Sequence, residues 1–140
     1  MLFDFGTKSI GAAVGQSITG TAAELKPLSA RDGIPQWPQI EALLKEWQPN
    51  QLLVGLPLHM DGTESALSAR ARKFGARLQG RFGLPVTMVD ERLSTREAKT
   101  TARARGHKGN YAQAPIDSIA ARILLEDWLQ QQPPSYLGKT

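Results

Sequence analysis

The sequence contains no cysteine, only two histidines and no long apolar run. Without cysteine the protein has no disulfides, no thiolate chemistry and no cysteine-ligated zinc, so any metal ion must be bound by oxygen or by His59 and His107. No apolar segment approaches the roughly 18 residues of a membrane span, and the N-terminus lacks the pattern of a secretory signal. These absences predict a cytoplasmic protein with no membrane partner.

The composition otherwise predicts a small globular protein with a slight positive charge. At 140 residues the chain is long enough to bury one core but not two. We therefore predict a single domain over residues 1–131 and a flexible tail over residues 132–140, which contains Pro133 and Pro134. Lysine and arginine number 17 against 13 aspartate and glutamate, a net charge of +4, which favours a polyanionic partner such as nucleic acid.

Short apolar runs separated by glycines predict an antiparallel sheet at the start of the chain. Its three strands are expected at about Leu2–Phe5, Ile10–Gly15 and Thr19–Leu28. Two further strands, Gln51–Leu56 and Val86–Asp90, each follow a segment whose apolar residues recur at helical spacing. Helical crossovers join parallel strands, so the predicted fold is α/β, with a mixed five-stranded sheet and helices on both faces. The first three strands are antiparallel and the last two are parallel additions.

Four helices are predicted around this sheet. The first ends before Pro49, and the second buries a stripe from Leu67 to Phe82. A third begins at a capping-box pattern at Ser94 and is followed by a loop over residues 103–113. The last runs from about Pro115 to Gln131 and turns these residues inward: Ile116, Ile119, Ala120, Ile123, Leu124 and Trp128.

One acid, Asp4, stands inside the first predicted strand between Phe3 and Phe5. Aspartate is depleted from strands, and a carboxylate buried between helix-covered layers needs a partner. A metal ion is the candidate partner. The alternative is a turn residue that caps the backbone amides around Gly6.

Four motifs in series resemble one protein family over almost the whole chain up to about Trp128. They are Phe-Asp-Phe-Gly-Thr-Lys-Ser-Ile-Gly at 3–11, Val-Gly-Leu-Pro-Leu at 54–58 with Met-Asp-Gly-Thr at 60–63, Asp-Glu-Arg-Leu-Ser-Thr at 90–95 and Ile-Asp-Ser-Ile-Ala-Ala at 116–121. Together these motifs resemble the YqgF family, also called RuvX, of pre-16S ribosomal RNA nucleases and Holliday-junction-resolvase-like proteins. The resemblance implies a ribonuclease-H-like domain.

The resemblance also implies a site and a reaction. Asp4, Glu91 and Asp117 match the family's carboxylates, which would bind Mg²⁺ or Mn²⁺ and hydrolyse phosphodiester bonds. The implied function is 5′-end processing of pre-16S ribosomal RNA in ribosome biogenesis, with a Holliday-junction-resolvase-like DNA endonuclease as the alternative. Only three residues precede Asp4, fewer than is usual in this family, so the first strand is expected to be short at its start.

Each of the other two acids has an ordinary structural explanation. Asp117 falls in the first turn of its predicted helix, where a carboxylate satisfies free amides and the helix dipole, although its spacing from Ala121 favours a position facing the sheet. Glu91 is a strand-end charge that could pair with Arg92. If the sheet has the strand order that the family resemblance implies, one strand separates Glu91 from Asp4, so Asp61 is the rival third ligand.

Basic residues suggest where a phosphate backbone would lie. Thr7 and Lys8 follow Asp4 directly, and a basic segment follows the last strand, so both are predicted to contact nucleic acid. The residues of that segment are Arg92, Arg96, Lys99, Arg103, Arg105 and Lys108. A second basic row lies on the long helix, where a solvated face is the commoner explanation. It consists of Arg70, Lys73, Arg77 and Arg81.

Two other classes of function compete with a nuclease. The first motif is similar to the phosphate loop of sugar kinases, actin and Hsp70 chaperones, but those proteins enclose ATP between two lobes. The non-catalytic alternative is a structured-RNA-binding or ribosome-associated module. Expected partners are structured RNA or branched DNA, with the ribosome as a further candidate. The chain is expected to be a monomer or weak homodimer, and cutting a junction symmetrically would need two active sites.

Overall fold

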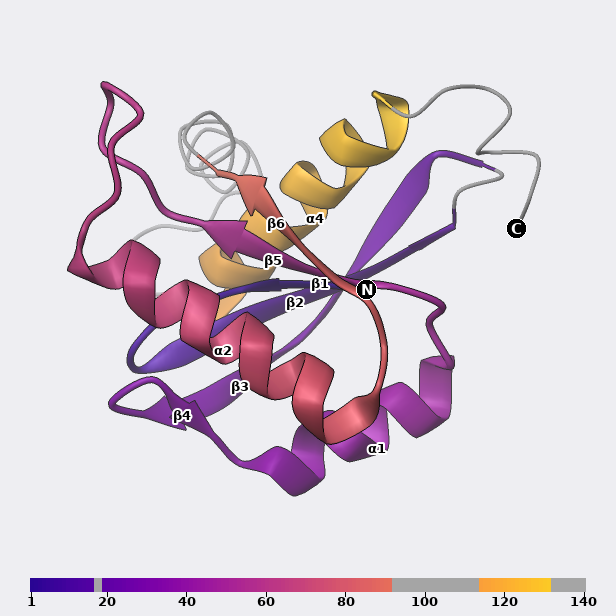
Figure 1. The fold of residues 1–140 in the computed structure, drawn as a ribbon. Coiled ribbons are helices and arrows are strands. Elements are labelled where there is room, and N and C mark those ends of the chain that lie inside the picture. The colour runs from indigo at the N-terminus through magenta and orange to yellow at the C-terminus, as the bar shows by residue number, and fades with distance from the viewer. Residues whose placement is uncertain (17–18, 92–113, 132–140) are drawn as a thin grey trace.

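The computed structural model describes residues 1–16, 19–91 and 114–131, and only the backbone of residues 114–117. A curved mixed sheet forms the centre of the molecule, and helices cover both of its faces (Figure 1). The strands are β1 (Leu2–Asp4), β2 (Ser9–Gln16), β3 (Thr21–Arg31), β4 (Ile34–Pro35), β5 (Leu52–Leu56) and β6 (Val86–Asp90). The described helices are α1 (Trp37–Trp47), α2 (Ala66–Phe82) and α4 (Ala114–Gln130).

The first strand lies in the middle of the sheet, whose order is β4-β3-β2-β1-β5-β6. β1 pairs with β2 antiparallel, placing Phe3 opposite Ala12, and with β5 parallel, placing Phe3 opposite Val54. β5 and β6 are also parallel. The carboxyl ends of β1, β5 and β6 therefore meet at one edge, which we call the carboxyl edge, and their starts meet at the opposite amino edge.

The two larger apolar cores of the described residues form on opposite sides of the sheet, because alternate residues of β1 face opposite sides. Phe3 packs with Ile40 of α1 and Phe74 of α2, whereas Leu2 packs with Ala121 and Leu124 of α4. β5 is buried along its whole length, as expected for a strand covered by helices on both faces. The cores hold the sheet between α1 and α2 on one side and α4 on the other.

Local chemistry sets the limits of α2. Ser65 and Ser68 form a reciprocal capping box that satisfies backbone donors at the helix start. Ser68 is fully buried and donates its hydroxyl hydrogen bond to the carbonyl of Pro57, which ties the helix start to the loop after β5. The helix ends at Gly83, whose φ of 69° is the left-handed conformation typical of a helix C-terminus.

The α/β fold with a mixed sheet and helices on both faces is confirmed, with three differences of detail. β3 extends to Arg31, and a short β4 adds a sixth strand to the predicted five. α4 buries Ala121, Leu125 and Leu129 in addition to the predicted Ile119, Ala120 and Leu124. The helix predicted from Ser94, the loop over 103–113 and the tail over 132–140 lie outside the described residues. No described helix is long and apolar enough to cross a membrane.

The aromatic cluster around Phe74 should dominate the stability of the larger core. The Phe74 ring lies 6.0 Å from Phe3, 5.5 Å from Phe5 and 6.1 Å from Trp37, measured between ring centroids. We expect Phe74→Ala to lower the free energy of unfolding by about 3–5 kcal/mol in urea denaturation, because it leaves a cavity between helix and sheet. Leu67→Ala, on the same helix but 38% exposed, should change it by about 0.5 kcal/mol or less. Equal losses for the two variants would contradict this assignment of the core.

Candidate active site

Asp4 is the last residue of β1 and lies at the carboxyl edge of the sheet. Its side chain is half-buried, and the alternation of β1 places it on the same face as Leu2, towards α4. The central strand therefore carries an acid at the edge where three parallel strands end. Such edges are where open α/β sheets bind their ligands.

The neighbouring strand β5 has no side chain at Gly55, beside the end of β1. β5 separates β1 from β6, and Gly55 lies two residues after Leu53, which packs on α4. A Cβ atom at Gly55 would collide with Oε2 of Glu91 and would lie 3.3 Å from Cδ2 of Leu124. The missing side chain thus leaves the space that the Glu91 carboxyl group fills. This role was not identified from the sequence, although a glycine inside a buried strand is a signal of close approach.

Glu91 follows β6 and reaches across β5 to Asp4. Its backbone amide donates to the carbonyl of Leu56 at 3.3 Å, and its Oε2 atom is completely buried. Burial raises the pKa of Glu91 above its ordinary value, and the charge of Asp90 acts in the same direction. A hydrogen bond between the Glu91 and Asp4 side chains opposes this rise. The two acids are therefore in contact, two strands apart in the sheet.

Two carboxyl groups in contact can share one proton or bind a cation between them. Asp4 and Glu91 form such a pair, and their oxygens are the donors that a hard divalent ion prefers. Among the side chains that the structure describes, no group of three acids or histidines is close enough to hold a metal ion. The donor set of this pair fits a divalent cation.

The backbone of Asp117 lies in the first turn of α4. One turn later, Ala121 packs against Leu2 and Leu53, whereas Leu125 and Leu129 reach the amino edge beside Met1. α4 therefore runs from the carboxyl edge to the amino edge, and its start is the end nearer to Asp4. The side chain of Asp117 lies outside the described part of the chain.

The rival acid, Asp61, lies at the exposed tip of the loop after β5. Its Oδ1 atom accepts hydrogen bonds from the backbone amide of Thr63 at 2.9 Å and from the Thr63 hydroxyl at 2.6 Å. These hydrogen bonds lower the pKa of Asp61. The carboxylate of Asp61 is thus occupied in shaping its own turn.

Thr7 and Lys8 lie in the loop that follows β1, and Lys8 is exposed. The carbonyl of Thr7 accepts from the Gly33 amide at 2.8 Å, and that of Lys8 accepts from the Ala30 amide at 3.0 Å. These bonds hold the loop against β3 and the turn after it. The predicted basic segment lies outside the described residues, and it comprises Arg92, Arg96, Lys99, Arg103, Arg105 and Lys108.

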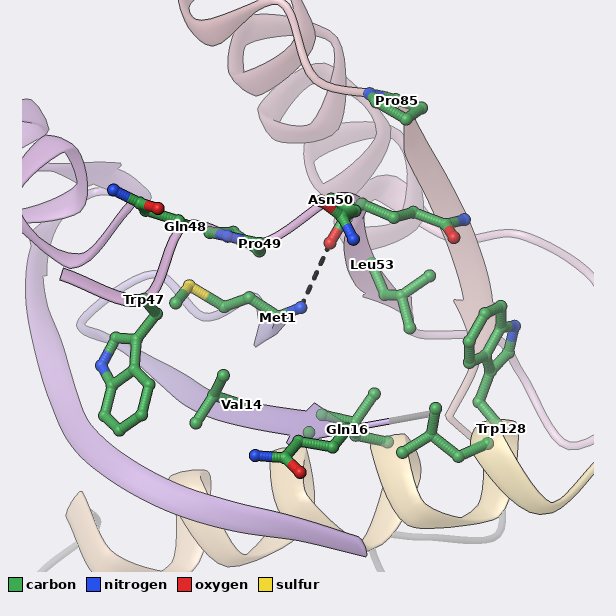
Figure 2. A pocket seen from close by; sticks show the side chains of 14 residues that line it. Met1, Val14, Gln16, Trp47, Gln48, Pro49, Asn50, Leu53, Pro85 and Trp128 are labelled. Atoms are coloured by element: carbon green, nitrogen blue, oxygen red, sulfur yellow. Dashed lines mark hydrogen bonds between the residues drawn. The ribbon is translucent and has the colours of Figure 1, made fainter. Parts of the chain in front are cut away.

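A cavity of about 390 Å³ opens at the amino edge (Figure 2). Trp47, Trp128 and Leu53 point into it, and the Met1 amine donates to the carbonyl of Gln51 at 3.1 Å. Burial lowers the pKa of this amine to about 6. Among the described residues that line the cavity there is no acid to hold a divalent cation.

The chain matches known proteins along most of its length. Residues 1–131 match a family described as "RuvX: Holliday junction resolvase". A protein of Saccharophagus degradans named "Putative pre-16S rRNA nuclease" is 64% identical over 135 residues, covering 96% of this chain and 95% of that protein. A protein of the same name from Chromohalobacter salexigens is 62% identical over 128 residues, covering 91% and 86%.

The fold is similar to that of a solved structure with little sequence in common. Thermus thermophilus RuvC, solved in complex with a Holliday junction substrate, superimposes with a TM-score of 0.52 at 14% identity, over 99% of this chain and 94% of RuvC. The ribonuclease-H-like architecture expected from the motifs is confirmed by this similarity. The chain therefore belongs to the RuvX family of nucleases, hydrolases that act on phosphodiester bonds.

Proposed function

We propose that the chain is a cytoplasmic, Mg²⁺- or Mn²⁺-dependent nuclease that processes the 5′ end of pre-16S ribosomal RNA. The contact between Asp4 and Glu91 across Gly55 is the observation that carries this proposal. It brings two acids together at the carboxyl edge, where α4 also begins. The names of the relatives support ribosomal RNA as the substrate.

Asp4, Glu91 and Asp117 would hold the metal. Asp4 would contribute a ligand from the central strand, Glu91 one from the residue after β6, and Asp117 one from the first turn of α4. A divalent cation held by these carboxylates would supply the means to activate a water near neutral pH and to stabilise charge on the leaving oxygen. The buried position of Glu91 keeps its carboxyl group fixed against Asp4 and excludes bulk water from that side.

The basic residues would position the substrate backbone. Thr7 and Lys8 follow Asp4 directly in the chain, and the basic segment from Arg92 to Lys108 follows Glu91. Contacts from these residues to phosphates fix the register of a strand without reading its sequence. The same arrangement suits a four-way DNA junction, which the family description favours as the second substrate. Symmetric cutting of a junction would require a dimer with two such sites.

The first prediction concerns the central acid. We expect Asp4→Asn to lower the cleavage rate of a precursor ribosomal RNA fragment by at least about 100-fold, because loss of a ligand exceeds the 10–100-fold cost of losing a group that merely orients one. Mg²⁺ or Mn²⁺ should raise the melting temperature of the wild type but not of Asp4→Asn. Cleavage would be measured beside a four-way junction and single strands, each with metal or EDTA.

Asp127→Asn is the matched control for this variant. Asp127 is an exposed acid of α4 that accepts a hydrogen bond from Gln131, so the same chemical change there should leave cleavage intact. Undiminished cleavage by Asp4→Asn would refute the mechanism. Binding of RNA without cleavage of any substrate would support the non-catalytic module instead.

The second prediction concerns the gap over β5. We expect Gly55→Ala to reduce cleavage strongly, because the new Cβ atom displaces the Glu91 carboxyl group from Asp4. Gly80→Ala provides the control, since no atom lies within 4 Å of its added Cβ and alanine favours the helix. Cleavage assays and thermal melts would be run on both variants. Equal activity of Gly55→Ala and wild type would show that the position of Glu91 is irrelevant.

The third prediction concerns the buried proton. Because burial raises the pKa of Glu91 above 4.5, the folded metal-free protein binds more protons than the unfolded chain above that pH. Its free energy of unfolding should therefore fall as pH rises from 4.5 towards neutrality, and Glu91→Gln should lack this component. Urea denaturation in EDTA would measure this: the stability of Glu91→Gln relative to wild type should increase as pH rises.

Glu41→Gln serves as the comparison for that series. Glu41 is an exposed acid of α1 that pairs with Lys45 at 3.3 Å. The stability of Glu41→Gln relative to wild type should not increase as pH rises. A Glu91→Gln series that runs parallel to wild type would contradict the buried, proton-binding state of Glu91.

A further inference from the structure

A second cleft, of about 200 Å³, lies on the opposite face of the sheet from Glu91. Arg70, Lys73 and Arg77 of α2 form one wall, and the other is formed by Asp32 and Gly33 of the turn between β3 and β4 and by Ile34 of β4. Its volume equals that of about seven waters in the liquid, enough for a phosphate group. Phe5 and Phe74 form the apolar floor.

This cleft opens at the same edge as the acid pair. Phe5, which follows Asp4 directly, lines its floor. The Gly33 amide donates to the carbonyl of Thr7 at 2.8 Å, so the turn rests on the loop that leaves β1. In Figure 1 the start of α2 and the β3–β4 turn lie at the end of the molecule where β5 terminates. A strand held at Asp4 could therefore continue over Thr7 into the cleft.

The turn is built to hold Arg70. Asp32 and Gly33 have φ angles of 50° and 80°, and Nη2 of Arg70 donates to the Asp32 carbonyl and to its Oδ1 at 3.0 Å. A side chain on Gly33 would lie 3.0 Å from Nη2 of Arg70 and 2.9 Å from the Phe5 ring, besides being strained. One cation of the cleft is thus fixed in position before any ligand binds.

The other two cations are exposed and make no ion pair with the described residues. On the same helix, Arg72 is occupied by Glu64 at 2.7 Å and Arg81 lies 4.2 Å over the Trp37 ring. Lys73 and Arg77 are spaced i and i+4, so they repel each other on one face of the helix. Their repulsion would be relieved by an anion between them.

The helix itself adds to the positive potential. α2 carries five basic residues and no acid, so its own charges make the potential along this helix positive. A solvated face explains exposed lysines in general, but not a hollow framed by three cations, one of which, Arg70, is already held in place by Asp32. This combination favours a bound phosphate.

We propose that the cleft between α2 and the β3–β4 turn binds a backbone phosphate of the nucleic-acid strand whose scissile bond lies at Asp4 and Glu91. Lys73 and Arg77 contact the phosphate, Arg70 borders it, and exposed Ile34 packs against the adjoining sugar or base. This inference rests on the proposed nuclease function for the identity of the ligand. It extends the substrate path to the face of the sheet opposite the acids.

The test uses a double variant, Lys73→Ala with Arg77→Ala, and measures binding rather than cleavage. Both side chains are exposed and alanine favours helices, so the variant should fold like wild type, which thermal melts would check. Fluorescence anisotropy would follow binding of labelled single-stranded RNA, and of DNA of the same sequence, in EDTA. We expect affinity to fall about tenfold for both nucleic acids, and the slope of log affinity against log salt to decrease by about 0.7, because one phosphate is no longer neutralised.

Lys45→Glu is the control matched in charge. Removing two cations and reversing one each change the net charge by −2, and Lys45 is a 76% exposed residue of α1 outside the cleft. Lys45→Glu should keep the wild-type salt slope and most of the affinity. With metal, the double variant should raise KM far more than it lowers kcat.

The outcomes separate this inference from the proposed function. If the double variant binds like Lys45→Glu while Asp4→Asn abolishes cleavage, the cleft is refuted and the nuclease stands. If wild type cuts nothing but the double variant still loses binding, the cleft stands and the nuclease is refuted. Failure of wild type to bind either strand refutes the cleft as well.

Discussion

The burial of Glu91 against Asp4 is the constraint on which the rest of the site depends. An isolated carboxylate is costly to bury, so this pair is tolerable only with a shared proton or a bound cation. The contact needs β1 at the centre of the sheet, β6 two strands away and no side chain at Gly55 between them. The mixed topology, and not the acids alone, therefore creates the site.

The sequence predicted the parts of this arrangement that depend on local patterns. Apolar alternation and helical crossovers identified five strands and their directions, because these features follow from residue periodicity and chain handedness. They did not reveal β4, a two-residue strand within a segment expected to lead into a helix. A segment this short carries no periodicity to detect.

The site was predictable in its residues but not in its geometry. Sequence placed one strand between Glu91 and Asp4 and left Asp61 as a rival, because reach across a sheet depends on what the intervening strand presents. The structure shows that the intervening strand presents Gly55, whose lack of a side chain leaves space for the Glu91 carboxyl group. It also engages Asp61 with Thr63 in its own turn. A sequence motif that contains only the two acids cannot show that their contact depends on Gly55.

The arrangement of charge explains how an acidic site can attract a polyanion. Asp4 and Glu91 are partly or largely shielded from solvent and share a proton or cation, so little of their negative charge reaches an approaching strand. Lys73 and Arg77 are exposed, and their field extends about 8 Å at physiological salt. An incoming strand therefore meets positive charge on α2 first. A cation bound at the acids would then reverse the sign of the local field where the chain is cut.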